Sequence, residues 1–202
     1  MSIKLNNYRL QVTGKTLFRT EELVIEKGGV NVLLGDNGAG KTTLFRSILG
    51  IGGELIGEDG SSWSPIEGAY VGTNRPQLQY LSVGDYLSFG ATAKTEKMQE
   101  VLQRKLACDF ESFQAVKQLS DGEFKKLAII RQLSFDPSVI FLDEPTAYLD
   151  VKNKDILGAF LKQESKHRLM ILSTHDLHFA GTYGQNCYKI EQGMLSKVRT
   201  VK

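Results

Sequence analysis

A glycine-rich turn between two contrasting apolar patterns constrains the fold of this 202-residue chain more than any other feature. The turn is preceded by residues 30–34 (Val-Asn-Val-Leu-Leu), a short and mostly apolar run that is typical of a buried central strand. Residues 40–49 follow with a helical pattern, and Gly50 stands where that helix would end. The order of strand, turn and helix indicates an α/β architecture.

The turn itself matches the pattern G-x-x-x-x-G-K-[ST] over residues 35–42. Glycines let backbone N–H groups surround phosphate oxygens, and the helix that follows adds the positive end of its dipole. Lys41 is predicted to reach the β- and γ-phosphates of a nucleotide, and the Thr42 hydroxyl to join the shell of a magnesium ion. The strand and helix on either side favour this interpretation over a plain glycine-rich turn. The residues predicted to bind nucleotide here are Gly35, Asp36, Asn37, Gly38, Ala39, Gly40, Lys41, Thr42 and Thr43.

Two carboxylates follow a second apolar run. Residues 139–142 (Val-Ile-Phe-Leu) read as a buried strand that ends at Asp143 and Glu144. Ligands of open α/β sheets bind at the carboxyl ends of the strands. Adjacent acids after a strand are usually part of a solvated loop, but a phosphate-binding turn in the same chain reverses that expectation. Asp143 is therefore predicted to hold magnesium, through water, and Glu144 to act as the general base for an attacking water.

The other segments continue an alternation of strands and helices, which implies a largely parallel sheet. We expect one domain over residues 1–202, with a small helical lobe inserted at about 74–135. The predicted β segments are 1–34, 69–71, 139–142, 169–172 and the hairpin 186–198, with a loop or hairpin at 51–66; the predicted helical segments are 40–49, 82–118, 121–133 and 151–165.

Composition excludes several classes of protein. Lys and Arg total 25 against 23 Asp and Glu, so no polybasic arm or acidic tail points to nucleic acid or a lipid surface. Only Cys108 and Cys187 are present, in separate segments, which argues against a metal cluster or disulfide framework and favours a reducing cytoplasm. No secretory signal is visible, and no run approaches the roughly 20 apolar residues that cross a bilayer. The chain is expected to be soluble and to rely on a partner for any membrane part.

Further motifs resemble those of the ABC ATPase family. Residues 119–123 (Leu-Ser-Asp-Gly-Glu) are similar to its signature motif Leu-Ser-Gly-Gly-Gln. Residues 144–146 (Glu-Pro-Thr) are followed by 147–150 (Ala-Tyr-Leu-Asp) in the place of the family's D-loop, and 173–176 (Ser-Thr-His-Asp) resemble its histidine switch. This resemblance spans nearly the whole chain. It implies a P-loop NTPase fold of the ABC type, with a parallel sheet core, an N-terminal antiparallel β subdomain and a small helical lobe, acting on ATP with Mg²⁺.

The same resemblance implies a head-to-tail dimer with an identical or a different ABC ATPase subunit. Ser120 and Gly122 of one subunit would complete the ATP site of the other. A physical reason supports this, because a Ser120 that caps the next helix can present its hydroxyl and the free amides there to a γ-phosphate. The plain alternative is a capping box formed with Glu123, and both can hold.

The resemblance also assigns the remaining roles. His175 would touch the γ-phosphate and sense its loss, and Asp150 would bind nucleotide from the D-loop. The predicted catalytic residues are thus Glu144, His175 and Lys41, and the predicted metal ligands are Thr42 and Asp143.

Three departures from the family pattern stand out. Asp121 replaces a glycine and Glu123 a glutamine, which adds negative charge near a partner's phosphates. The glutamine of the family's Q-loop is replaced, with Thr73, Asn74 and Gln77 as the candidates for its position. The aromatic residue that stacks on adenine is also missing, since Val12 falls at its spacing and the nearest rings are Tyr8 and Phe18. Base stacking is left unassigned.

The leading hypothesis is the ATP-hydrolysing subunit of a transporter, held at the inner face of the cell membrane by separate permease subunits. Residues 73–75 (Thr-Asn-Arg) and the Asp-Gly-Glu of the signature resemble some bacterial iron-chelate importer ATPases, which hints at metal-chelate import. One alternative is a non-transport ABC ATPase that acts on a cytoplasmic complex. A further alternative is a regulator that binds nucleotide without hydrolysis, and the presence of Lys41, Asp143, Glu144 and His175 argues against it.

Overall fold

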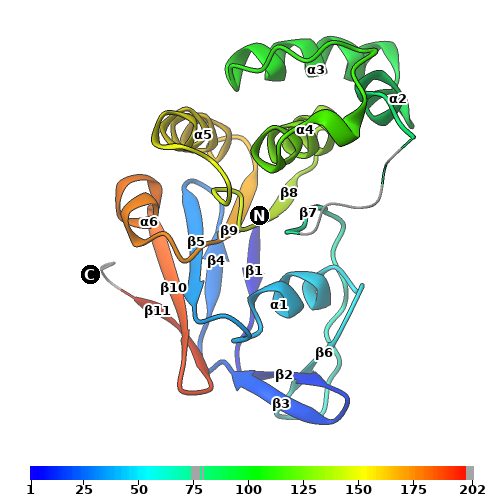
Figure 1. Ribbon diagram of the computed structural model, residues 1–202. Coiled ribbons are helices and arrows are strands. Elements are labelled where there is room, and N and C mark those ends of the chain that lie inside the picture. Colours follow the sequence, from blue (N-terminus) through cyan, green and yellow to red (C-terminus); the bar gives the residue numbers. More distant parts are fainter. Residues whose placement is uncertain (74–77, 79, 199–202) are drawn as a thin grey trace.

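The computed structural model describes residues 1–73, 78 and 80–198, and its centre is a nine-stranded sheet. The strand order is β6-β2-β3-β11-β10-β5-β9-β8-β7 (Figure 1). Neighbouring strands from β10 to β7 run parallel, which confirms the predicted parallel core. These strands are β10 (Asn186–Glu191), β5 (Val30–Gly35), β9 (Leu169–Ser173), β8 (Val139–Asp143) and β7 (Ala69–Val71).

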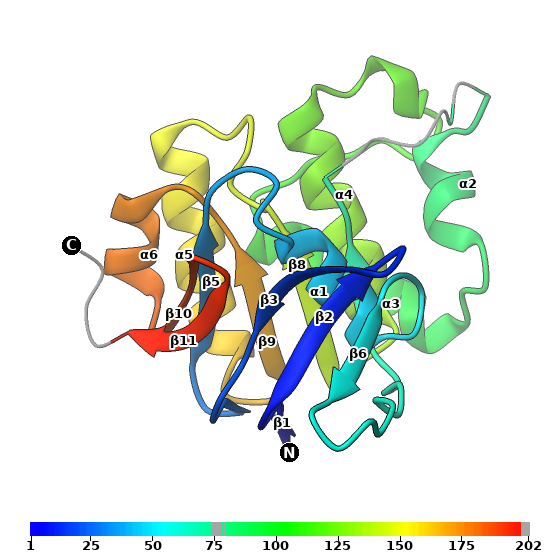
Figure 2. The same cartoon turned by 90° about the horizontal axis from the view of Figure 1, so that it is seen from below.

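The other end of the sheet is antiparallel, as the resemblance implied. There β2 (Tyr8–Val12) lies between β3 (Lys15–Arg19) and β6 (Glu54–Gly57). This end is continuous with the core because β11 (Met194–Val198) pairs with both β3 and β10. The β10–β11 pair is the predicted C-terminal hairpin, and Figure 2 shows it beside the antiparallel strands.

A second, two-stranded sheet is formed by β1 (Ser2–Lys4) and β4 (Val24–Glu26).

Helices cover both faces of the parallel strands (Figure 1). One face packs against α1 (Lys41–Ile48), and the other against α4 (Asp121–Ser134), α5 (Val151–Glu164) and α6 (Leu177–Tyr183). Side chains of a strand alternate between faces, so β8 contributes Val139 and Phe141 to the apolar cluster of α1, and Ile140 and Leu142 to that of α4 and α5. With apolar residues on both faces, β8 is buried throughout and only its carboxyl end offers polar groups.

The helical part beside β7 has three elements before α4. These are α2 (Val83–Ser88), α3 (Ala93–Lys105) and the short 3₁₀ turn η1 (Val116–Gln118). Ser82 and Thr92 accept N–H bonds at the starts of α2 and α3, so the predicted helical stretch 82–118 is broken by separate caps. Leu87 and Leu102 join the apolar cluster of the parallel strands. The division of the chain into a core and an inserted lobe stays a prediction.

One helix was not predicted from the sequence. The seven residues of α6 are too few for a clear helical period, although Asp176 caps the helix by accepting the Phe179 N–H at 2.9 Å. None of the helices that the structure describes is both apolar and long enough to span a bilayer.

Candidate nucleotide-binding site

The glycine-rich turn joins β5 to α1, as predicted. Gly38 and Gly40 have φ values of 81° and 102°, a region that side chains disfavour. A β-carbon at Gly40 would also lie 3.2 Å from a ring carbon of Phe18. A side chain at Gly40 would therefore strain the backbone and crowd Phe18, and the turn brings its backbone amides to the start of α1.

Lys41 folds back over the turn. Its ammonium donates to the carbonyl oxygens of Gly35 at 2.6 Å and Asp36 at 3.0 Å, and the residue is only 7% exposed. The positive charge is thus held at the mouth of the turn, where a phosphate would lie. The contact of Lys41 with nucleotide phosphates stays a prediction.

The Asp143 carboxylate stands at the carboxyl end of β8 and is 1% exposed. Three hydroxyls donate to it: Thr42 at 2.5 Å and Tyr70 at 3.0 Å to Oδ2, and Ser173 at 2.5 Å to Oδ1. Burial and the Asp143 charge raise the pKa of Tyr70, and its phenol is the donor in this contact. The Thr42 contact joins residues 101 positions apart and fixes the turn against β8.

Glu144 follows in a left-handed conformation, with φ 48°, which is strained for a residue with a side chain. Its N–H is held by the Ser173 carbonyl at 3.2 Å and the Ser173 hydroxyl at 3.0 Å. Glu144 Oε2 is buried, accepts no hydrogen bond from the described residues, and lies 3.0 Å from Nδ1 of His175. The two side chains form an ion pair only when the imidazole is protonated, and that of His175 is 71% exposed.

Lys125 of α4 enters the site from the other side, and the sequence pattern did not single it out. Its buried ammonium donates to the carbonyl oxygens of Gly72 at 2.6 Å and Asp143 at 3.1 Å. Burial lowers the pKa of Lys125, and the charges of Asp143 and Glu144 oppose that shift. This cation links α4 to the ends of β7 and β8.

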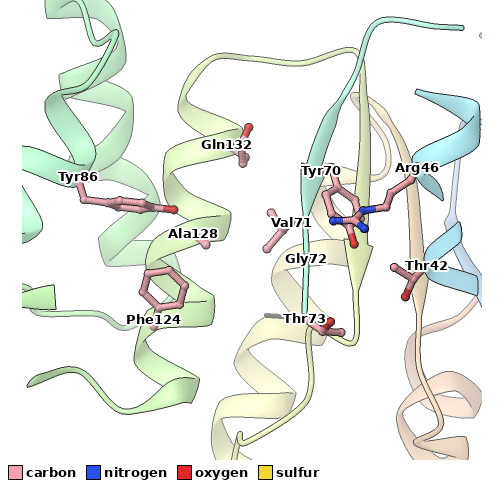
Figure 3. Close-up of a pocket in the computed structure, with 10 residues that line it drawn as sticks. All are labelled: Thr42, Arg46, Tyr70, Val71, Gly72, Thr73, Tyr86, Phe124, Ala128 and Gln132. Carbon is pink, nitrogen blue, oxygen red and sulfur yellow. The ribbon is translucent and has the colours of Figure 1, made fainter. Parts of the chain in front are cut away.

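Two neighbouring cavities meet at Thr42 and Thr73. The one beside the turn has a volume of about 230 Å³. The other has about 320 Å³, and Figure 3 shows it between α1 and α4. The smaller cavity brings together Leu17, Asn37, Gly38, Gly40, Lys41, Thr42, Thr43, Thr73, Asp143 and Glu144.

Ser120, Gly122 and Asp150 do not line these cavities. Ser120 is exposed and forms the predicted capping box: its hydroxyl accepts the Glu123 N–H at 3.2 Å, and its own N–H donates to the Glu123 carboxylate at 2.8 Å. Gly122 is buried, and a β-carbon there would lie 2.8 Å from the Tyr148 carbonyl oxygen. Asp150 caps α5 by accepting the Asn153 N–H at 2.7 Å.

The departures from the family pattern can be placed only in part. Thr73 is exposed and lines both cavities, whereas Asn74 and Gln77 lie outside the described residues. Among the candidates for a base contact, Phe18 is 1% exposed beneath the turn, and Tyr8 packs edge-on against Trp63 at 5.7 Å between ring centroids. Leu17 is the apolar side chain that reaches the smaller cavity.

The donor set at the turn fits magnesium. Thr42 and Asp143 supply two oxygen donors 2.5 Å apart at the mouth of the turn. Mg²⁺ prefers this arrangement, in which one or two protein oxygens are completed by water and substrate phosphates.

Comparisons with known proteins show the family and the fold of this chain. The family model described as ABC transporter matches residues 18–147. The spermidine/putrescine import ATP-binding protein of Spiroplasma citri is 33% identical over 98% of this chain, which spans 61% of that relative's length. The tungstate uptake system ATP-binding protein of Peptoclostridium acidaminophilum is 29% identical over 98% of both chains. A dimeric ATP-binding cassette in a post-hydrolysis state, bound to ADP and Pi, superposes with a TM-score of 0.74 at 22% identity, over 98% of this chain and 99% of that one.

Proposed function

This chain belongs to the ABC transporter family as an ATP-binding ATPase domain, and on that premise we propose that it hydrolyses MgATP at the turn of residues 35–43 to power transport through a separate membrane partner. The observation that carries the proposal is the contact of Thr42 with Asp143, 101 residues apart, with Glu144 next in the chain. It joins a phosphate-binding turn to two carboxylates at the edge of the sheet. That combination suits phosphoryl transfer to water.

Each residue of the turn and of β8 has a chemical task in this proposal. The backbone amides of the turn and the Lys41 ammonium bind the phosphates. Thr42 and Asp143 would hold Mg²⁺, which when bound neutralises charge on the phosphate oxygens. Glu144 takes a proton from the attacking water.

Two features prepare Glu144 for this task. Its backbone is fixed by two bonds to Ser173, and its buried Oε2 is left with acceptor capacity. His175, 3.0 Å from that oxygen, is the polar group through which Glu144 would respond to the terminal phosphate. A second subunit brings Ser120 and Gly122 to the same phosphate, with Asp150 close to the interface.

The exposed positions of the residues proposed to meet a second subunit support dimerisation. Ser120, Asp150 and His175 are exposed, so a second copy, or a different ABC ATPase subunit, can reach them. The dimeric cassette with ADP and Pi provides a precedent in a protein of the same fold. The partner in the membrane would be a permease, with this chain bound at its cytoplasmic face.

The cargo follows only by analogy. The two relatives are named for spermidine/putrescine import and tungstate uptake, which supports import. The iron-chelate resemblance of residues 73–75 rests in part on positions outside the described residues, and it stays a prediction. We also propose that residues 1–202 act as one unit with the helical lobe at about 74–135.

The test is a Glu144→Gln variant. Removing a general base should lower the rate of ATP hydrolysis by roughly 10²- to 10⁴-fold, while nucleotide binding at the turn should persist. ATP hydrolysis is measured by phosphate release, and size-exclusion chromatography with ATP should show a dimer that the wild-type chain loses as it turns over. Glu96→Gln, on the exposed surface of α3, is the matched control and should hydrolyse ATP normally. Full turnover by Glu144→Gln would remove Glu144 as the base.

A further inference from the structure

Four side chains from three elements form a small network beside the turn. Thr42 and Arg46 are four residues apart on α1 and therefore share one side of the helix. Thr42 contacts Asp143 of β8, while the Arg46 guanidinium lies 5.8 Å from the ring centre of Tyr70 of β7. Tyr70 closes the network by donating to Asp143 at 3.0 Å (Figure 3 shows Thr42, Arg46 and Tyr70).

The register of the sheet explains how Tyr70 reaches this aspartate. Tyr70 pairs with Phe141, so both side chains lie on the face of the sheet that α1 covers. Asp143 is two residues further along β8 and lies on the same face. A tyrosine is long enough to span this diagonal. Tyr70 is also the only polar side chain in β7.

The hydroxyl donors account for most of the acceptor capacity of Asp143. An ionised carboxylate has about four lone-pair sites, and three hydroxyls donate to this one. Ser173 and Tyr70 come from the strands on either side of β8, so the carboxylate is held from both neighbours. Thr42 can donate to Asp143 and still offer its oxygen to a cation, because a hydroxyl is both donor and acceptor.

We propose that Tyr70 is a positioning residue for the magnesium site: its hydroxyl fixes the Asp143 carboxylate in the orientation that a bound cation requires. This inference rests on the proposed function, because it presumes that Thr42 and Asp143 serve a cation beside the phosphates. Groups that hydrogen-bond to metal-binding carboxylates commonly tune metal affinity. Here that group comes from β7, the strand that ends two residues before Thr73.

The experiment measures ADP binding rather than turnover. Isothermal titration calorimetry gives the ADP affinity of wild type and Tyr70→Phe in EDTA, and then over a series of Mg²⁺ concentrations. Removing the hydroxyl should leave binding in EDTA unchanged and raise the Mg²⁺ concentration at the midpoint roughly tenfold or more, within the range known for groups behind metal ligands. Free Mn²⁺, counted by electron paramagnetic resonance in the presence of ADP, should rise in parallel.

Tyr183→Phe is the matched control. Tyr183 also donates to an aspartate, Asp155, at 2.9 Å, but this pair lies between α5 and α6 away from the turn. The control should keep the wild-type Mg²⁺ midpoint. A thermal melt of each variant compares their folding.

The outcomes separate the two levels of the proposal. An unchanged Mg²⁺ midpoint in Tyr70→Phe, with ADP still bound, overturns the role of Tyr70 and leaves the proposed function standing. An equal shift of the Mg²⁺ midpoint in Tyr183→Phe also overturns the role of Tyr70, because the shift would then follow from the loss of any tyrosine hydroxyl. Failure of the wild-type chain to bind ADP under any condition contradicts the proposed function itself.

Discussion

The turn at residues 35–43 and the helix start at Ser120 are both sites predicted to contact phosphate, yet their surroundings differ. At the turn, Lys41 and Asp143 are buried and bonded to other parts of the chain, including residues far away in sequence. At the start of α4, Ser120 is exposed and its hydrogen bonds stay within four residues of it, at Glu123 and Phe124. The site at the turn is held by contacts between distant parts of the chain, whereas the site at Ser120 is an exposed local motif.

This difference suggests that nucleotide binding at the turn needs one chain, whereas a phosphate contact at Ser120 needs two. We expect the turn to bind a nucleotide in the monomer, because long-range contacts such as that of Thr42 with Asp143 already fix its geometry. We expect the exposed Ser120 to contact a phosphate only when a second subunit presents one. Variants at the two sites should therefore change different measurements.

The largest effect is expected from Lys41→Ala. This variant removes the cation at the mouth of the turn, and each hydrogen bond to a charged group is worth about 1.5–3 kcal/mol, so ADP affinity should fall roughly 10- to 100-fold. Titration calorimetry on the isolated chain measures it. Lys97→Ala, on the exposed surface of α3, is the control and should bind ADP as wild type does. Unchanged affinity in Lys41→Ala would contradict a phosphate site at the turn.

A smaller effect is expected from Gly122→Ala, which tests how the second site is held. The new β-carbon would lie 2.8 Å from the Tyr148 carbonyl oxygen and 3.0 Å from a Leu149 methyl carbon. Overpacking typically costs about 1–3 kcal/mol, which outweighs the helix preference of alanine, so the melting temperature should fall by roughly 2–4 °C.

Gly181→Ala provides the opposite control within the same experiment. Gly181 lies in α6, and nothing stands within 4 Å of the position of its β-carbon. That variant should be as stable as wild type or more so, by up to about 1 kcal/mol. If both variants melt alike, the close fit of α4 against residues 147–150 is wrong.

The sequence predicted the parts of the site that are local in the chain. The turn at residues 35–42 is a contiguous pattern, and the carboxylates directly follow a run of apolar residues, so both could be placed on elements before the structure was known. The same holds for the Ser120 cap, where the hydroxyl and the N–H that it accepts are three residues apart. In each case the interacting groups are close in sequence.

What the sequence did not predict depends on packing between distant elements. Tyr70 lies in a strand of three residues, which is too short for a pattern to show which way the ring points. Lys125 would ordinarily be expected in solvent, since lysine is rarely buried, and only the position of α4 against β7 and β8 turns it inward. The need for glycine at Gly122 likewise comes from a backbone carbonyl 26 residues later in the chain.

A modest change in stability is expected from Ser120, and its variants distinguish the two sites most directly. Loss of a capping side chain costs about 1 kcal/mol, so Ser120→Ala and the matched Ser82→Ala, which removes the same capping box from α2, should lower the melting temperature by similar amounts. ADP binding by the monomer should be unchanged in both. ATP hydrolysis should fall only in Ser120→Ala, because only this hydroxyl is proposed to meet a partner's phosphate. Ser120→Gly separates cap from contact: glycine at a helix cap costs only a few tenths of a kcal/mol, so stability should be largely retained while the hydroxyl is lost and hydrolysis falls. Normal hydrolysis by Ser120→Gly would reduce Ser120 to a helix cap and remove its side chain from the site.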